Sequence, residues 1–373
     1  MLLRAPAKIN LSLGILSKRA DGYHEISSLM RAIRLFDEAE ILFSGQNGAD
    51  GAGSGRPRVA LSVRGDTEGV PDGPGNLAYR AAELALKAWG SGNGDGNGDD
   101  DDDGNGKGDG DGNGLCGLPG IDSRRIDIIL TKRIPAAAGL AGGSADAAAV
   151  LLGLAKGLKP DIGLGEVASL GASLGADVPF CVYSCAAANP FLGYEGAGAA
   201  LAEGIGEKIT PVQPAGSGWV VLVKPPVAIN TGEVYALYDA RQNDAAHALY
   251  DARQNDAAFT GRHGVGAGPG HTGGNDLQAP CAEAHPIVAE VIDGLGKICA
   301  EEAAGGARGA LCQLSGSGPT VFAYFAAENP ADGHRARKAA ENPATIVYKR
   351  AKEVFPGMFV YLTETLPSCR DMV

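Results

Sequence analysis

A run of small residues between two patterned segments has the composition of an anion-binding loop. Residues 135–148 read PAAAGLAGGSADAA; alternating apolar residues precede them at 125–131, and apolar residues at helical spacing follow from Ser144 onward. Small residues let the backbone curl closely, and a helix N-terminus offers free N–H groups and a positive dipole end to an anion. The pattern indicates a strand, a phosphate-binding loop and a helix; the alternative is a flexible connection whose glycines serve packing alone.

Neither common glycine fingerprint for nucleotides fits this loop. There is no GxxxxGK[ST] sequence, because Lys107 is followed by Gly108, and no GxGxxG opens the helix. Whatever binds here is therefore held in neither a P-loop nor a Rossmann turn. The Ser144 hydroxyl either caps the helix or turns toward a ligand.

Polar residues that could act on a bound phosphate lie far apart in the sequence. Residues 5–13, APAKINLSL, alternate as a half-buried strand does, so Lys8 and Asn10 point the same way. Asp177 stands in LGADVPF, either as a turn or cap residue or as a buried carboxylate that would need a charged partner. A second glycine loop, LSGSGPTVF at 314–322, joins two apolar segments and by itself suggests a hairpin turn.

Length and charge limit the classes of function. The 373 residues suffice for two domains of about 100–200 residues each. The formal net charge is −12, of which the segment 90–114, with eight aspartates and one lysine, supplies −7. No dense Lys/Arg patch appears, which argues against a nucleic-acid partner and leaves a small anionic substrate open.

Cysteine spacing and hydropathy bear on the compartment. Seven cysteines without a CxxC pair suggest neither a disulfide framework nor a zinc site, and favour a reducing compartment. No apolar run reaches 18 residues and the first residues read as a strand, so we expect a soluble chain without a membrane span or signal peptide. Glycine- and aspartate-rich insertions suggest an algal or other eukaryotic gene and hence the plastid stroma, with bacterial cytoplasm as the alternative. Monomer and homodimer both stay open.

Two segments interrupt the pattern. The segment 90–114 is expected to be a disordered insertion, because it cannot bury enough apolar surface to offset chain ordering. Its DxDxDG sequence at 99–104 resembles half of an EF-hand loop, but Gly110 stands where a bidentate Glu is needed, which disfavours calcium. The block ALYDARQNDAA at 236–246 recurs at 248–258 and is interpreted as an expanded surface loop or a helix extension.

Five motifs, taken in this order, resemble the GHMP kinases. They are PAKINLSL at 6–13, RADGYHEISSLM at 19–30, PAAAGLAGGSADAA at 135–148, LGADVPF at 174–180 and LSGSGPTVF at 314–322. The first two narrow the resemblance to the branch that phosphorylates 4-diphosphocytidyl-2-C-methyl-D-erythritol with ATP in the non-mevalonate isoprenoid pathway. The resemblance covers nearly the whole chain outside the insertions.

The resemblance implies an α+β protein with the GHMP kinase fold. A ribosomal-protein-S5-domain-2-like N-terminal domain would span residues 1–214 and carry the ATP loop and the insertion 90–114. A ferredoxin-like C-terminal domain would span residues 215–373, with a loop insertion at about 236–272. Substrate and ATP would meet between the two domains.

By the same resemblance, the residues after the Asp-Gly turn belong to a cytidine pocket. Tyr23 would stack on the cytosine, His24 would hydrogen-bond its edge, and Tyr235 would form a second aromatic wall. A planar base gains about 1–3 kcal/mol from an aromatic face in nucleic-acid sites, and its edge needs a polar partner. The alternative for all three residues is packing in the core.

The resemblance also implies roles around the transferred phosphoryl group. Asp177 matches the catalytic base, which would take the proton of the tertiary hydroxyl as its oxygen attacks the γ-phosphorus of ATP. Lys8 matches the lysine beside it and would offset the charge that builds on the reacting oxygens, unless it is a solvated strand lysine. Asn10 would orient the same hydroxyl. The ATP phosphates, bridged by Mg²⁺, would be wrapped by Pro135, Ala136, Ala137, Ala138, Gly139, Leu140, Ala141, Gly142, Gly143, Ser144 and Ala145.

The loop departs from the usual GLGGGS of the family. Ala141 replaces the middle glycine, and its methyl group would restrict the backbone or crowd the β-phosphate. Ala145 and Asp146 stand where many members have Ser-Asn, although Ala-Asp is also familiar. Neither change removes a catalytic group.

Two rival functions stay open at this point. One is another GHMP kinase acting on a different small alcohol, such as homoserine or mevalonate, but those relatives lack the DGYH segment. The other is an inactive nucleotide-binding homologue or a calcium-responsive acidic protein. The presence of Lys8 and Asp177 argues against this second function.

Overall fold

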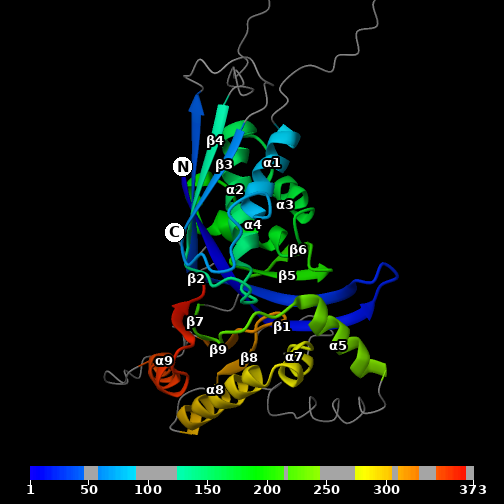
Figure 1. Ribbon diagram of the computed structural model, residues 1–373, viewed down its shortest axis with the longest axis vertical. Coiled ribbons are helices and arrows are strands. Elements are labelled where there is room, and N and C mark those ends of the chain that lie inside the picture. The colour runs from blue at the N-terminus through cyan, green and yellow to red at the C-terminus, as the bar shows by residue number, and fades with distance from the viewer. Residues whose placement is uncertain are drawn as a thin grey trace, which may run out of the picture.

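The computed structural model describes residues 1–45, 58–89, 124–213, 217–243, 274–304, 310–326 and 342–366. The predicted insertion at 90–114 and the second copy of the repeat at 248–258 lie outside these residues. Within the described part, helices pack on two separate sheets, which confirms the α+β class (Figure 1). None of the described helices has the length and apolar character needed to cross a membrane.

The first sheet is built around two long antiparallel strands. Its strands run in the order β3-β4-β2-β5-β6, with β1 paired to β2, and only β3 and β4 are parallel. The Asp21-Gly22 turn between β1 and β2 is confirmed, because Gly22 has a φ of +88°. The strands are β1 (Leu2–Lys18), β2 (His24–Gly45), β3 (Arg58–Gly65), β4 (Arg124–Lys132), β5 (Ala199–Gly204) and β6 (Lys208–Pro211).

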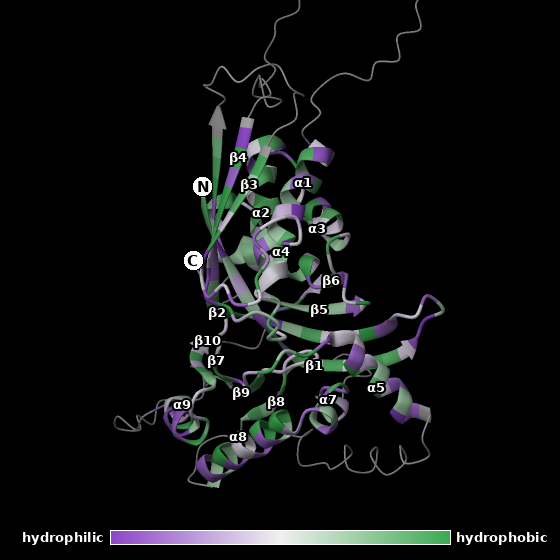
Figure 2. Cartoon of the chain, in the orientation of Figure 1, coloured by the Kyte–Doolittle hydropathy of each residue, from purple (hydrophilic) through white to green (hydrophobic). Residues whose placement is uncertain are grey.

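Helices cover one face of this sheet and bury its apolar side chains (Figures 1 and 2). Residues 147–155 of α2 are alanine, valine, leucine and glycine and are buried, while α1 presents four buried alanines. Such small side chains let the helix backbones approach each other and the sheet closely. The helices are α1 (Leu77–Trp89), α2 (Gly142–Leu158), α3 (Leu164–Ala172), α4 (Val178–Ala188) and the short 3₁₀ helix η2 (Pro190–Leu192).

The second sheet is antiparallel, in the order β10-β7-β9-β8. Its strands are β7 (Gly218–Lys224), β8 (Leu311–Leu314), β9 (Val321–Ala326) and β10 (Phe359–Glu364). The helices beside it are α5 (Thr231–Asn243), α7 (Gln278–Ala284), α8 (Pro286–Ala304) and α9 (Pro343–Val354). Residues 214–216, at the proposed domain boundary, are outside the described residues, so the boundary at 214 and 215 stays a prediction.

The first strand is buried on both faces, so the prediction of a half-buried strand was wrong. Ala7 and Ile9 belong to an apolar cluster with β7 and β9 of the second sheet. On the opposite face, Lys8 and Asn10 are only 4% and 0% exposed. The cause is tertiary, because strands of the second sheet pack on Ala7 and Ile9, and α2 and α4 also pack against β1.

The two halves are joined by backbone hydrogen bonds and by a buried arginine. Arg31 on β2 donates from Nη2 to Thr365 Oγ1 and to the Leu366 carbonyl, both at 3.0 Å. The Leu366 N–H in turn donates to the Ala32 carbonyl at 2.9 Å. The last described residues, Thr365 and Leu366, are therefore fixed to the first sheet.

A buried ion cluster anchors the strand that leads into the glycine-rich loop. Lys132, the last residue of β4, pairs with Asp37 on β2 and with Asp146 on α2, whose Oδ2 is 2.5 Å from its Nζ. All three side chains are at most 3% exposed. Asp37 Oδ1 also accepts from the N–H groups of Arg133 and Ile134, at 2.5 and 2.8 Å. Since Lys132 precedes the loop and Asp146 follows it, the cluster fixes both ends of the loop.

The glycine-rich loop rests on the loop between β8 and β9. Gly139 has a φ of +73°, and a Cβ there would overlap the Ser315 carbonyl oxygen and lie 2.7 Å from that of Gly318. Ser315 Oγ donates a hydrogen bond of 3.0 Å to the Gly139 carbonyl. Only glycine allows this close approach between loops that belong to different sheets.

We expect Gly139→Ala to destabilise the protein more than Gly193→Ala, measured by chemical denaturation. Gly193 has a similar φ of +70° but nothing within 4 Å of the added Cβ. Its substitution should cost about 1–2 kcal/mol from the backbone alone, while Gly139→Ala adds about 1–3 kcal/mol from overlap. Equal losses in the two variants would show that the loops do not depend on this contact.

Removal of the Asp37 carboxylate should destabilise the fold severely. Asp37→Ala removes one of the two carboxylate partners of the buried Lys132 ammonium and leaves the N–H groups of Arg133 and Ile134 without their acceptor, at a cost of about 3–5 kcal/mol. The control is Asp127→Ala on the neighbouring strand, whose ion pair with Arg125 is partly exposed and should be worth at most about 1 kcal/mol. Urea denaturation of both variants measures the difference, and a loss for Asp37→Ala no larger than for the control would contradict an anchoring role.

Candidate active site

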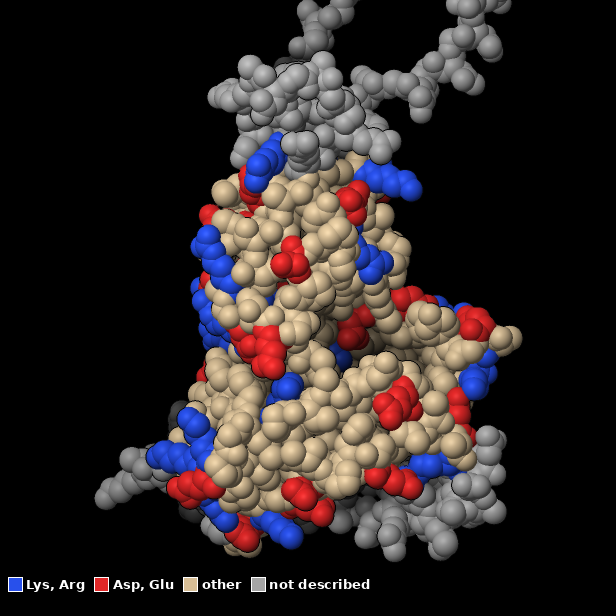
Figure 3. Space-filling view, in the orientation of Figure 1, with Lys and Arg blue, Asp and Glu red and all other residues tan. Residues whose placement is uncertain are grey.

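A cavity of about 920 Å³ lies between the two halves of the molecule. The space-filling view shows the surface hollowed between the upper and lower parts, with acidic and basic atoms at the hollow (Figure 3). Both halves line the cavity, with Lys8 and Asp177 from the first and Tyr235 and Ser317 from the second. This arrangement agrees with the expectation that ligands meet between two units.

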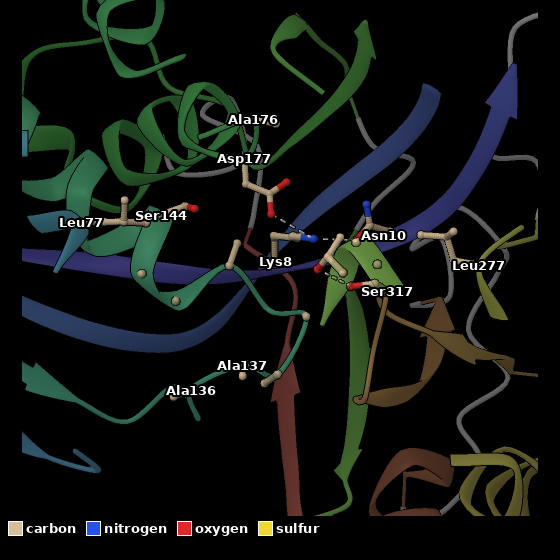
Figure 4. Close-up of a pocket in the computed structure, with 18 of the residues that line it drawn as sticks. Lys8, Asn10, Leu77, Ala136, Ala137, Ser144, Ala176, Asp177, Leu277 and Ser317 are labelled. Atoms are coloured by element: carbon tan, nitrogen blue, oxygen red, sulfur yellow. Dashed lines mark hydrogen bonds and ion pairs between the residues drawn. The ribbon is translucent and has the colours of Figure 1, made fainter. Parts of the chain in front are cut away.

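The structure brings Lys8 and Asp177 together in this cavity (Figure 4). Lys8 Nζ lies 3.5 Å from Asp177 Oδ2 and donates a hydrogen bond of 2.8 Å to Asn10 Oδ1. Asn10 Nδ2 donates to Ser28 Oγ at 2.8 Å, and that hydroxyl donates to the Ser12 carbonyl at 2.6 Å. This chain of hydrogen bonds fixes the Lys8 ammonium against β2.

Lys8 and Asp177 differ in exposure, which suits different tasks. The Lys8 side chain is 5% exposed, whereas that of Asp177 is 33% exposed. Asp177 stands at the N-cap of α4, but its side chain makes no cap hydrogen bond. Its carboxylate is therefore free to face the cavity and a ligand.

Most of the glycine-rich loop lines the cavity. Pro135 to Gly139 and Ala141 to Ser144 face it, whereas Leu140 and Ala145 are fully buried and do not. The helix begins at Gly142 with Ala141 as its N-cap, so the suggestion that Ser144 caps the helix was wrong. Ser144 lies in the first turn of α2, beside the free N–H groups that an anion would meet.

Ala141 occupies a backbone conformation that glycine adopts more easily. Its φ of 58° and ψ of 30° lie in the left-handed region, which costs a residue with a Cβ roughly 1–2 kcal/mol. Ala137 in the same loop also has a positive φ, of 48°. The loop thus keeps the shape that glycine would give it and stores strain at two alanines.

The residues after the Asp-Gly turn line another part of the same cavity. Tyr23 is 61% exposed, so one face of its ring is open to a ligand. His24 is 8% exposed and stacks on Tyr235, with 4.8 Å between ring centroids and 25° between planes. Burial and the carboxylates of Asp177 and Asp276 raise the pKa of Tyr235 to about 12.

Sequence reasoning missed two charged residues of this region, Lys18 and Asp239. Asp239 lies 2.7 Å from His24 Nε2 through Oδ1 and 2.6 Å from Lys18 Nζ through Oδ2. Burial raises the pKa of Asp239, but the hydrogen bonds from Lys18 and His24 outweigh it, and the net shift is downward. The sequence does contain a pattern that could have identified Asp239. Thr231, Tyr235 and Asp239 are four residues apart, a spacing that places them on one face of a helix.

The buried ion cluster also reaches the cavity, through Lys132 and Asp146. Burial raises the pKa of Asp146 to about 7, against the lowering effect of the Lys132 ammonium and with a smaller raising effect of Asp37. Asp146 Oδ1 has no hydrogen-bond partner in the described part of the chain. Asp146 thus lies behind the glycine-rich loop as one of the two carboxylates that pair with Lys132.

Comparisons with known proteins bear on the family to which the chain belongs. Residues 113–185, which include the glycine-rich loop and Asp177, match the GHMP kinases N terminal domain. A curated 4-diphosphocytidyl-2-C-methyl-D-erythritol kinase of Geobacter sulfurreducens is 35% identical over 89% of this chain and 92% of its own length. The kinase of the same name from Moorella thermoacetica is 35% identical over 97% of this chain and 99% of its own.

The fold is also similar to that of a solved structure of a kinase of this kind. A crystal structure of 4-(cytidine 5'-diphospho)-2C-methyl-D-erythritol kinase superposes with a TM-score of 0.58 at 26% identity, covering 98% of this chain and 99% of the other. The predicted GHMP kinase fold is thus confirmed. Relatives this similar over nearly the full length establish membership, and the chain belongs to the 4-diphosphocytidyl-2-C-methyl-D-erythritol kinase family within the GHMP kinases.

Proposed function

We propose that this protein transfers the γ-phosphoryl group of ATP to the 2-hydroxyl of 4-diphosphocytidyl-2-C-methyl-D-erythritol, in the non-mevalonate isoprenoid pathway. The observation that carries the proposal is the pair formed by Lys8 and Asp177, 3.5 Å apart in a cavity that the glycine-rich loop also lines. An acid–base pair beside free helix N–H groups suits transfer of a phosphoryl group to an alcohol. Membership of the family supports the same substrate.

Each residue at the reacting end has one task in the proposed reaction. Asp177 accepts the hydroxyl proton as the substrate oxygen forms its bond to the γ-phosphorus, and the bond from that phosphorus to the β–γ bridging oxygen breaks to release ADP. The Lys8 ammonium stabilises the negative charge on the reacting oxygens. Asn10 holds Lys8 and orients the hydroxyl. The low exposure of Lys8 strengthens its interaction with that charge.

The loop from Pro135 to Ala145 would hold the ATP phosphates through backbone N–H groups and the start of α2. Mg²⁺ would accompany the nucleotide. No group of three or more His, Cys, Asp or Glu among the described residues could hold a metal alone. Mg²⁺ commonly keeps several waters and binds through substrate phosphates with one or two protein oxygens, so the cavity fits an ion carried by ATP. The Ser144 hydroxyl would hold it, and the bound ion would neutralise phosphate charge.

The cytidine end would be formed by Tyr23, His24 and Tyr235. The exposed face of Tyr23 is available for stacking on the base, and His24 supplies a polar group for its edge. Because Tyr235 packs on His24, it supports the pocket from behind through that ring.

The direct test of the proposal is ADP release by the purified protein with three alcohols. Turnover with the cytidylylated substrate, and not with homoserine or mevalonate, is the expected result. Turnover with homoserine or mevalonate instead would assign the chain to a different GHMP activity. Absence of turnover with all three would identify an inactive homologue.

Asp177→Asn should lower kcat about 10²- to 10⁴-fold, since a positioned general base contributes that much. The affinity for ATP should change by no more than a few-fold, because Asp177 does not bind the phosphates. Steady-state kinetics and nucleotide titration measure the two effects. Thermal unfolding checks that the variant is folded, and undiminished kcat in a folded variant would rule out the base assignment.

Tyr23→Ala should weaken the cytidylylated substrate far more than ATP. Loss of one stacking face worth about 1–3 kcal/mol raises KM for that substrate about 5- to 150-fold. Phe191→Ala is the matched control, because Phe191 is an equally exposed aromatic residue, 65% exposed, that does not line the cavity. Parallel losses for both substrates in Tyr23→Ala would exclude a base-specific role.

A further inference from the structure

Three residues form a connected polar relay at the wall of the cavity, Lys18, Asp239 and His24. Each oxygen of the Asp239 carboxylate has its own partner, Lys18 Nζ at 2.6 Å and His24 Nε2 at 2.7 Å. The ring of His24 is also held by stacking on Tyr235 and by an edge contact with Tyr238 at 6.2 Å. The imidazole is therefore fixed in both position and orientation.

The relay determines which nitrogen of His24 carries the proton. An ionised carboxylate only accepts hydrogen bonds, so Nε2 must be the protonated nitrogen that faces Asp239. In a neutral imidazole whose Nε2 carries the proton, the other ring nitrogen, Nδ1, is a hydrogen-bond acceptor. In the described part of the chain, no group hydrogen-bonds Nδ1. His24 thus offers a hydrogen-bond acceptor, Nδ1, to a ligand in the cavity.

We propose that Asp239 is a positioning residue that makes this pocket select cytosine over uracil, acting through His24. The inference rests on the proposed function, in which His24 faces the edge of the base. The amino group of cytosine at N4 donates a hydrogen bond, whereas uracil has an accepting oxygen at the same place. An acceptor at Nδ1 therefore pairs with cytosine and opposes uracil.

The position of Asp239 in the chain makes the assignment specific. It lies in the first copy of the repeated block, on α5, and its sequence equivalent in the second copy is Asp251. The same helix carries a separate ion pair, Arg241 with Glu283 on α7. Asp251→Asn and Glu283→Gln are therefore matched controls, one for local sequence and one for the attachment of α5.

The experiment is calorimetric titration of the full chain with cytidine diphosphate and with uridine diphosphate. The wild-type protein should prefer the cytosine nucleotide, and Asp239→Asn should lower the ratio of the two affinities at least tenfold, because an amide can accept or donate and no longer fixes the tautomer. The two control variants should keep the wild-type ratio, and ATP affinity should stay constant throughout.

A spectroscopic measurement separates the tautomer from a merely structural role. The ¹⁵N chemical shifts of His24 should show the Nε2–H tautomer in the wild-type protein and a mixture in Asp239→Asn. An unchanged affinity ratio in Asp239→Asn, equal affinities in the wild type, or a changed ratio in Asp251→Asn would overturn the inference. Because the titration uses nucleotides alone, its outcome is independent of whether the protein phosphorylates the cytidylylated substrate.

Discussion

The buried ammonium group of Lys8 is the interaction on which the arrangement of β1, β2 and α4 depends. A buried charge is tolerated only when it is paired and hydrogen-bonded. Here the partners are Asn10 two residues away and Asp177 at the start of α4, at 2.8 and 3.5 Å from the nitrogen. The register of β1 on β2 and the placement of α4 beside β1 must therefore both be correct before the charge is stabilised.

Two glycine loops, one from each half of the molecule, meet beside the cavity. Gly139 allows the backbone contact with the β8–β9 loop, and the cluster around Lys132 holds both ends of the glycine-rich loop. Arg31 joins the first sheet to Thr365 and Leu366, which follow β10. These contacts hold the loop in place even though Ala137 and Ala141 have unfavourable backbone conformations, as is common at ligand sites.

The two ends of the cavity suit different ligand groups, one through electrostatic interactions and the other through aromatic stacking and hydrogen-bond direction. Around the glycine-rich loop, backbone N–H groups and Lys8 suit negative charge that moves during a reaction. Around Tyr23 and His24, an open aromatic face and an oriented imidazole suit a neutral planar base, whose identity is read by hydrogen-bond direction. A substrate that carries both a nucleotide base and an alcohol matches such a combination.

Local elements could be predicted from the order of residues alone, since hydrophobic periodicity and small residues indicate strands, helices and loops without reference to distant partners. The sequence thus predicted the strands at 5–13 and 125–131, the glycine-rich loop and the helix after it, and the order of its motifs identified the family. Periodicity could not predict that the polar face of β1 is buried, or that α2 begins before Ser144. Nor could it single out Asp239, because the repeated block offers the same residues twice. Only tertiary packing decided these points, since pairing and burial depend on which distant segments come together.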